Sequence, residues 1–301
     1  MEAMCNLQAM LFLLLFVGAI SRKLGIITAE GRKCLSGMVI KIILPFNILK
    51  SFCITWSYEI LSKVIVVLAV AIIFQIMYVI LSKILYRGIE SDKRAILQYG
   101  TICSNAGFMG NPIVEAIYDS EGLLYTSIAL IPLRVAMWSS GLSLFTKADK
   151  KTMVKKVALH PCMISVYIGF VIMLLQLKLP NFLMNCVTSI ANCNTAVSML
   201  VIGAILADMN WRDIFDPYLF YYSGIRLIVI PLIVFGIMKL IGIDSMVTGV
   251  TVLLSAMPAG STTVLLADTY GKNSKYASAC VFLSTVLSLI TLPLISTILF
   301  W

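Results

Sequence analysis

The sequence predicts an all-α integral membrane protein, with ten transmembrane helices arranged as two inverted five-helix repeats in which helices four and nine are broken. Three observations predict this class: the composition, the number of long apolar segments and an internal similarity. Of 301 residues, 60% are hydrophobic and 12% are charged, whereas soluble domains have about 45–50% apolar and about 25% charged residues. The composition therefore places the chain in a lipid bilayer.

Ten apolar segments are long enough to cross a hydrocarbon core of about 30 Å as helices. They lie near residues 6–21, 35–53, 60–82, 93–118, 122–145, 159–177, 183–207, 217–240, 246–270 and 275–299.

Basic residues orient these segments. The odd-numbered loops hold sixteen of them, namely Arg22, Lys23, Arg32, Lys33, Lys83, Arg87, Lys93, Arg94, Lys147, Lys150, Lys151, Lys155, Lys156, Arg212, Lys272 and Lys275. The even-numbered loops and their edges hold only Lys50, Lys63, Lys178 and Lys239. Because short cytoplasmic loops are enriched in lysine and arginine, we expect the odd loops in the cytoplasm and both termini outside.

The net charge of +9 would suggest nucleic-acid binding in a soluble protein. Here the bases are spread over separate short loops without interleaved aromatic residues, so nucleic acid is not an expected partner. The eight cysteines form no C-x-x-C pair, and no metal or redox framework is implied. The only histidine, His160, precedes Pro161. We interpret it as a helix-start residue at the interface rather than part of a zinc site or catalytic triad.

Shifting the chain by 152 residues against itself aligns segment 93–118 with 246–270 and segment 122–145 with 275–299. Five spans, an odd number, separate the two copies, so they must insert with opposite orientation. The shift therefore predicts an inverted-topology repeat.

Each copy contains a break in mid-membrane. The first reads CSNAGFMGNP over residues 103–112, and the second reads SAMPAGSTT over residues 255–263. In lipid, unwound backbone is tolerated only where protein buries it or where it lines a cavity. Two breaks at equivalent positions therefore predict one central site.

Both breaks contain residues suited to restarting a helix. Asn111 and Pro112 resemble an N-cap followed by an N1 proline. Pro258 precedes Ser261 and Thr262, which are also able to cap. Helix N-termini that point inward offer N–H groups and a positive dipole end, so we expect an anion-binding site, most simply for a carboxylate.

The chain also resembles the auxin efflux carrier family, which includes plant auxin carriers and bacterial malate and malonate permeases, over nearly its whole length. The matching segments are GAISRKLGIITAEGRKCLSGMVIKIILPFNIL, SNAGFMGNPIVEA, RLIVIPLI and MPAGSTTVLLADTYGKNSKYASACVFLSTVLSLITLPLI. The resemblance implies ten helices in which the broken helices four and nine cross.

It also implies a scaffold domain from residues 1–56 and 157–212 and a mobile transport domain from residues 57–146 and 213–301. Residues 147–156 would form the cytoplasmic loop that joins the repeats, and a homodimer would form through the scaffold. The family's pocket asparagine matches Asn105, with Gly107 allowing close backbone approach. Asn105 could instead be a helix-break cap bonded only to local backbone.

The chain departs from the family at two positions. Span seven lacks a proline near Val197 to match Pro45, which puts in doubt how closely the scaffold crossing is preserved. His160 stands where an asparagine often precedes the proline of span six.

Charges within spans are costly unless they are paired or face water. Arg134 could neutralise a carboxylate substrate or hold helices together. Glu115, Asp268 and Arg226 are candidates for ion pairs or for coupling. Lys41 lies near enough to the inner edge to extend its amine to the interface.

The sequence contains neither a G-x-x-x-x-G-K-[ST] nucleotide motif nor an H-E-x-x-H pair, so neither an ATP-driven pump nor an enzyme is expected. The expected function is secondary active transport of a small mono- or dicarboxylate, of the auxin, malate or malonate kind, across the plasma membrane. An elevator mechanism, no cofactor and H⁺ or Na⁺ as coupling ion are expected. A channel or a ligand sensor on the same fold is the alternative.

The predicted orientation can be tested by cysteine labelling in a background stripped of exposed thiols. A membrane-impermeant reagent added outside should modify a cysteine placed at Asp244 and spare one placed at Lys151. The reverse pattern would contradict the orientation.

Overall fold

The computed structural model describes residues 2–55, 57–146, 154–155, 157–208 and 214–299. In these ranges the regular elements are helices, apart from one isolated β-bridge. The α-helices are α1 (Glu2–Lys23), α2 (Ala29–Met38), α3 (Leu44–Phe52), α4 (Tyr58–Leu85), α5 (Ser91–Ile102), α6 (Asn111–Ala136), α8 (Pro161–Leu174), α9 (Asn181–Ala207), α10 (Pro217–Gly224), α11 (Ile230–Ile241), α12 (Ser245–Ser255), α13 (Thr262–Thr269) and α14 (Ser274–Leu299). Short π-helices continue several of them, namely η1 (Val39–Ile43), η2 (Ala106–Gly110), η3 (Met137–Gly141) and η6 (Ile225–Val229), and η4 (Leu142–Leu144) is a 3₁₀ turn.

Six helical segments of the described residues are long and apolar enough to cross a membrane: Ala29–Phe52, Tyr58–Leu85, Ala106–Leu144, Asn181–Ala207, Pro217–Ile241 and Ser274–Ile298. The multi-pass membrane prediction is thus supported. The other expected spans correspond to α1, to the shorter apolar helix α8 and to the two broken segments. The boundary expected between spans four and five falls inside α6, where Asp119 has a non-helical backbone with φ 52° and ψ −150°.

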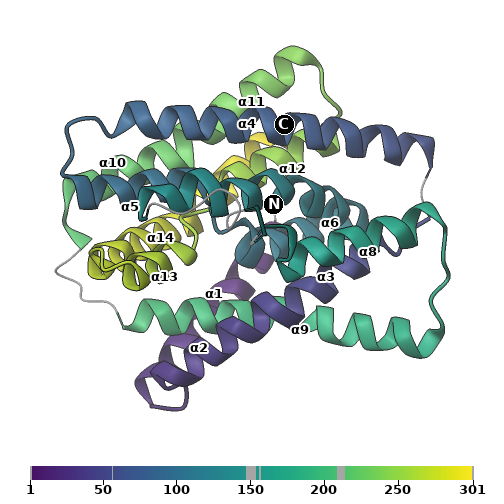
Figure 1. Ribbon diagram of the computed structural model, residues 1–301, viewed down its shortest axis with the longest axis horizontal. Helices are drawn as coiled ribbons and strands as arrows, with labels where there is room; N and C mark the ends of the chain where they lie inside the picture. Colours follow the sequence, from purple (N-terminus) through teal and green to yellow (C-terminus); the bar gives the residue numbers. More distant parts are fainter. Residues whose placement is uncertain (1, 56, 147–153, 156, 209–213, 300–301) are drawn as a thin grey trace.

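The helices are arranged around the two breaks (Figure 1). Helix α9 lies low in this view, close to α1, α2 and α3, whereas α4 and α11 lie at the top, with α10 below α4 on the left. Helix α9 packs on α1 and α3, and α3 packs on α8. The broken segments, α5 with α6 and α12 with α13, lie between these two groups of helices.

The two breaks meet each other directly. Ser104 and Ala259 form an antiparallel β-bridge, the N–H of Asn105 donates to the carbonyl of Pro258 at 2.8 Å, and the N–H of Gly260 donates to the carbonyl of Cys103 at 3.0 Å. Each break therefore satisfies backbone groups that lipid cannot satisfy.

Side chains satisfy further backbone groups at the ends of the half-helices. Gln75 of α4 donates its amide to the carbonyl of Ile102 at 2.9 Å. The hydroxyl of Ser284 in α14 accepts the N–H of Ala259 at 3.2 Å. The breaks are thus anchored to helices on both sides.

Gly260 is the glycine that this contact requires. A Cβ atom there would lie 3.0 Å from the carbonyl oxygen of Cys103 and 3.2 Å from that of Ser104. Both neighbours are backbone atoms already fixed by the pairing. At Gly107, in contrast, the nearest atom to an added Cβ would be in the Leu44 side chain, at 3.9 Å.

Gly260→Ala should therefore destabilise the protein by about 1–3 kcal/mol, because the methyl group forces the paired backbones apart. Thermal unfolding in detergent, without ligand, measures the effect. Gly107→Ala is the matched control and should change stability little. Equal melting temperatures for the two variants would contradict the role given to Gly260.

Candidate functional site

A cavity of about 110 Å³ adjoins the meeting point of the two breaks. Its lining comes from both breaks, from α5, α6, α8 and α13, and from the π-helices η1, η2 and η3. Residues with polar side chains in this lining are Tyr99, Ser104, Asn105, Arg134, Trp138, His160, Cys162, Ser261 and Thr262. A cavity with polar lining residues therefore lies beside the two breaks, where the sequence predicts a central site.

Two buried donors in this cavity have no partner. The side-chain amide nitrogen of Asn105 and the Nη1 atom of Arg134 are both buried and form no hydrogen bond. The side chains are almost fully enclosed, with 3% and 6% of the residue surface exposed. Since buried polar groups in folded proteins are nearly always paired, both atoms favour an acceptor in the cavity.

The charge of Arg134 is also uncompensated by protein. Among the described residues no carboxylate forms an ion pair with it. A guanidinium keeps its proton under any ordinary condition, and a buried charge without a counter-charge is unfavourable. An anion in the cavity would supply both the negative charge and the missing acceptors.

The second break adds hydroxyl groups to the same wall. Ser261 and Thr262 line the cavity at the start of α13. The hydroxyl of Tyr99 donates to Oγ1 of Thr262 at 3.2 Å, so the Thr262 hydroxyl proton remains available to a ligand.

The backbone N–H groups contribute less than expected. The N–H groups of Thr263 and Val264 bond to Gly260 and Ser261 at the start of α13, and Met109 bonds to Asn105. These three N–H groups are therefore used by the turns that restart the helices.

The structure brings together only some of the predicted site residues. Five of them line the cavity: Asn105, Gly107, Arg134, Ser261 and Thr262. Asn111, Pro112, Pro258, Glu115 and Arg226 are not in its lining. The carbonyl of Pro258 pairs with the first break, and Asp268 lies in α13, with a side chain outside the described part of the structure.

Asn111 does not cap a helix, which corrects the expectation from the sequence. Its backbone is helical, with φ −54° and ψ −53°, because the π-helix η2 runs into α6 without interruption. The chain restarts earlier, at Ala106, directly after Asn105. The side chain of Asn111 instead donates to Oδ1 of Asn47 at 3.2 Å.

Glu115 belongs to the same polar cluster, outside the cavity. Lys50 donates to its carboxylate at 2.8 Å and to Oδ1 of Asn192 at 3.2 Å. Asn47 approaches the other carboxylate oxygen at 3.5 Å. These contacts join α3 to α6, so Glu115 is an ion-pair residue here.

Arg226 is enclosed elsewhere. Only 1% of its surface is exposed, and it lies over the ring of Tyr78 with 5.5 Å between the guanidinium carbon and the ring centroid. Its Nε and Nη1 atoms have no partner. The cation–π contact stabilises the charge in part.

A larger cavity of about 620 Å³, the vestibule, adjoins the first. The two share Ile40, Phe108, Ser261, Thr262 and Leu265. Charged residues around the vestibule are Arg32, Lys33, Lys41, Asp208 and Lys275. Asp208 is paired with Arg22 and Arg32 at 2.7 and 2.6 Å, so the net charge of this lining is positive and attracts anions.

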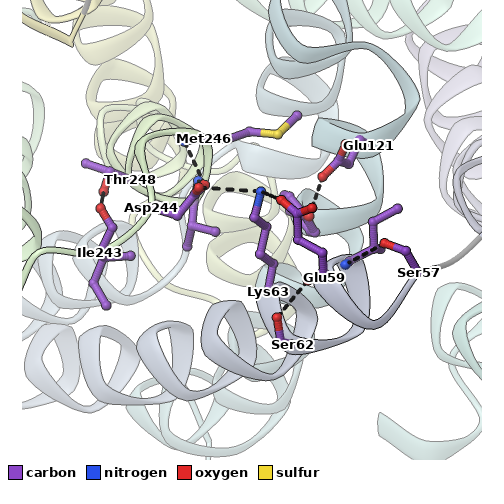
Figure 2. A network of polar contacts seen from close by, with 12 residues as sticks. Ser57, Glu59, Ser62, Lys63, Glu121, Ile243, Asp244, Met246 and Thr248 are labelled. Atoms are coloured by element: carbon purple, nitrogen blue, oxygen red, sulfur yellow. Dashed lines mark hydrogen bonds and ion pairs between the residues drawn. The ribbon is translucent and has the colours of Figure 1, made fainter.

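A separate network fixes the start of α12. Figure 2 shows Lys63 between Glu59 and Asp244, with Glu121 close by. Lys63 lies 2.9 Å from the Glu59 carboxylate and 3.4 Å from that of Asp244. Asp244 also accepts the N–H groups of Met246 and Val247, which caps α12.

Among the described residues no group of acidic, histidine and cysteine side chains is arranged to hold a metal ion.

Sequence reasoning did not place Ser104, Trp138, His160 or Cys162 in the site. His160 and Cys162 flank Pro161 at the start of α8, and only the three-dimensional packing of α8 against α3 and α6 brings them to the cavity. A single sequence offers no signal for that packing.

Comparisons with known proteins agree with this picture of a transporter. Residues 4–296 match the sequence profile of a family described as "Membrane transport protein". A protein of Methanothermobacter thermautotrophicus described as an uncharacterized transporter is 27% identical over 298 residues, covering 95% of each chain. Another uncharacterized transporter, from Methanocaldococcus jannaschii, is 23% identical over 293 residues, covering 94% of each chain.

The family profile and both relatives point to a transporter and not to an enzyme. The chain, with its polar cavity beside two paired helix breaks, belongs to the membrane transport protein family.

Proposed function

We propose that the protein is a secondary active transporter of a small organic anion across the plasma membrane. The observation that carries this proposal is the pair of unpartnered buried donors, Asn105 Nδ2 and Arg134 Nη1, in one cavity. Only a ligand with acceptor atoms and negative charge complements both groups.

A carboxylate is the anion that fits best. It has acceptor positions for the guanidinium, the Asn105 amide and the hydroxyl groups of Ser261 and Thr262. The similarity to carriers of auxin, malate and malonate supports the same chemistry. The proposed substrate is therefore a small mono- or dicarboxylate, and its transport is driven by a gradient of H⁺ or Na⁺.

Alternating access is proposed for the mechanism. The vestibule is lined by Arg32 and Lys33 of α2 and by Lys275 at the start of α14, and the sequence predicts all three on the cytoplasmic side. On the opposite side, Lys50 and Asn47 of α3 bond to Glu115 and Asn111 of α6. The arrangement supports a state open to the cytoplasm and closed to the outside.

The contacts of Lys50 with Glu115 and of Asn47 with Asn111 would then separate when the site opens outward.

In this proposal ten helices form two inverted repeats with crossing broken helices. Residues 1–56 and 157–212 form the scaffold, through which a homodimer assembles. Residues 57–146 and 213–301 move as an elevator, and both termini lie outside.

A channel and a ligand sensor on the same fold are the competing functions. Flux measurements distinguish a transporter from both of them. Purified protein in liposomes loaded with unlabelled malonate should accumulate external labelled malonate by counterflow, with saturation. Malate and indole-3-acetate are tested in the same way. A channel would show no counterflow, and a sensor would bind a carboxylate without flux.

Asn105→Ala should weaken carboxylate binding by about 1–3 kcal/mol, since the ligand oxygen loses its hydrogen-bond donor. Asn105→Asp should weaken it further, because the added negative charge repels the anion in a poorly screened cavity. Ligand-induced thermal shift and calorimetry measure both effects.

Lys151→Ala, in the loop that joins the repeats, is the control and should leave affinity unchanged. If Asn105→Ala binds and transports every tested carboxylate as the wild type does, the amide has no role in binding. The site would then depend on Arg134 without it.

Glu115→Gln should favour the outward-open state, because it weakens the Lys50 ion pair between α3 and α6. The two side chains are 19% and 25% exposed, so the pair is worth about 1 kcal/mol and the shift is about fivefold. The readout is the labelling rate of Ser51→Cys by an impermeant thiol reagent added outside, since Ser51 is fully buried here.

Glu59→Gln provides the matched control. Glu59 also pairs with a lysine, Lys63, but within α4 itself, so its loss should not change labelling at position 51. Equal labelling rates in the two variants would argue against a gate at Lys50 and Glu115.

A further inference from the structure

His160 occupies a position that the proposed anion site does not yet explain. It is the N-cap of α8, directly before Pro161, and its Nδ1 atom accepts the N–H of Cys162 at 3.3 Å. The expectation of a helix-start residue is confirmed. Its side chain also lines the cavity that contains Asn105 and Arg134.

The capping bond determines which ring nitrogen carries the proton. Because Nδ1 accepts a backbone N–H, it is unprotonated, and the proton of the neutral ring is on Nε2. Among the described residues Nε2 has no hydrogen-bond partner. The ring lies near that of Trp138, with 6.4 Å between centroids and 41° between planes.

We propose that His160 is a further ligand-binding residue of the anion site, whose neutral ring donates its Nε2–H to the bound carboxylate. The inference rests on the proposed function. It adds a donor from the start of α8 to those from the first break, the second break and α6, so that four separate elements contact one anion.

Charge balance favours a neutral ring over an imidazolium. The titratable or charged side chains that line the cavity with His160 are Arg134, Tyr99 and Cys162, so the empty cavity already holds one cation. A second cation would repel Arg134 in a poorly hydrated space and would break the capping bond to Cys162. A neutral donor adds affinity and orientation without these costs.

The single histidine makes a direct test feasible in the wild-type protein. In tag-free protein labelled with ¹⁵N-histidine, the imidazole signals should show the neutral Nε2–H form at pH 7. Saturating malonate should shift the Nε2 signal while the ring stays neutral. An imidazolium signal with ligand, or an unchanged Nε2 signal, would overturn the proposal.

The corresponding variant is His160→Ser, which keeps an oxygen able to cap α8 but removes the ring donor. Its affinity for malonate should fall about tenfold, as expected for loss of one hydrogen bond to a charged ligand. Its melting temperature without ligand should stay close to that of the wild type. His160→Asp also keeps the cap and should bind more weakly still, because its charge repels the anion.

Calorimetry in buffers of different ionisation enthalpy completes the test. Wild-type protein and His160→Ser should show the same proton uptake on binding between pH 6.5 and 8. Proton uptake that disappears in His160→Ser would mean that His160 carries a proton, and unchanged affinity in His160→Ser would mean that it does not touch the ligand. Either result overturns the proposal.

Malonate, malate and indole-3-acetate are each tested, so that failure of this inference can be told from failure of the function. If the wild type binds one of them, and Asn105→Ala weakens the binding whereas His160→Ser does not, the transporter proposal survives and only the role of His160 is lost. If the wild type binds none, both proposals fall.

Discussion

The backbone pairing between the two breaks is the interaction on which the rest of the structure depends. A helix interrupted in lipid exposes several N–H and carbonyl groups, each costly to leave unpaired. Here the groups of Asn105 and Gly260 bond to the opposite break at 2.8 and 3.0 Å. Because these two N–H groups find their acceptors in the opposite break and not in their own helix, the two breaks depend on each other and lie side by side.

This mutual dependence explains why the polar cavity lies where it does. The paired segments bond to each other and to the turns that restart the helices, and the cavity adjoins the place where they meet. Asn105 directly follows Ser104 of the β-bridge, and its backbone N–H bonds to Pro258. The backbone of Asn105 is therefore fixed, while its side-chain amide nitrogen has no partner. Arg134, from a different part of the fold, supplies the charge. The paired backbones of the two breaks thus border a polar cavity whose lining contains the buried cation Arg134.

The sequence was sufficient to predict the features that depend on local chemistry. The membrane class and the two breaks followed from composition and repeat. Of the predicted residues that line the cavity, Ser261 and Thr262 followed from the second break and Arg134 from its charge within a span, whereas Asn105 and Gly107 followed from the family resemblance. The restart at Ala106 was missed because Asn111 and Pro112 carry a strong capping pattern, whereas the π-helix η2 continues through them. His160 and Trp138 were missed because α8 and η3 reach the cavity through tertiary packing. No pattern within one segment encodes such packing.

The asymmetry around the cavity has an energetic consequence for a transporter. On one side lies a vestibule with a positive lining, and on the other α3 and α6 are joined by one partly exposed ion pair and a few amide contacts. Partly exposed pairs are worth about 1 kcal/mol, which is small enough for thermal motion to break. The backbone bonds between the two breaks, in contrast, are buried, and water does not replace them readily. A movement that opened the far side would therefore separate α3 from α6 and leave the paired breaks, with the proposed anion site, intact.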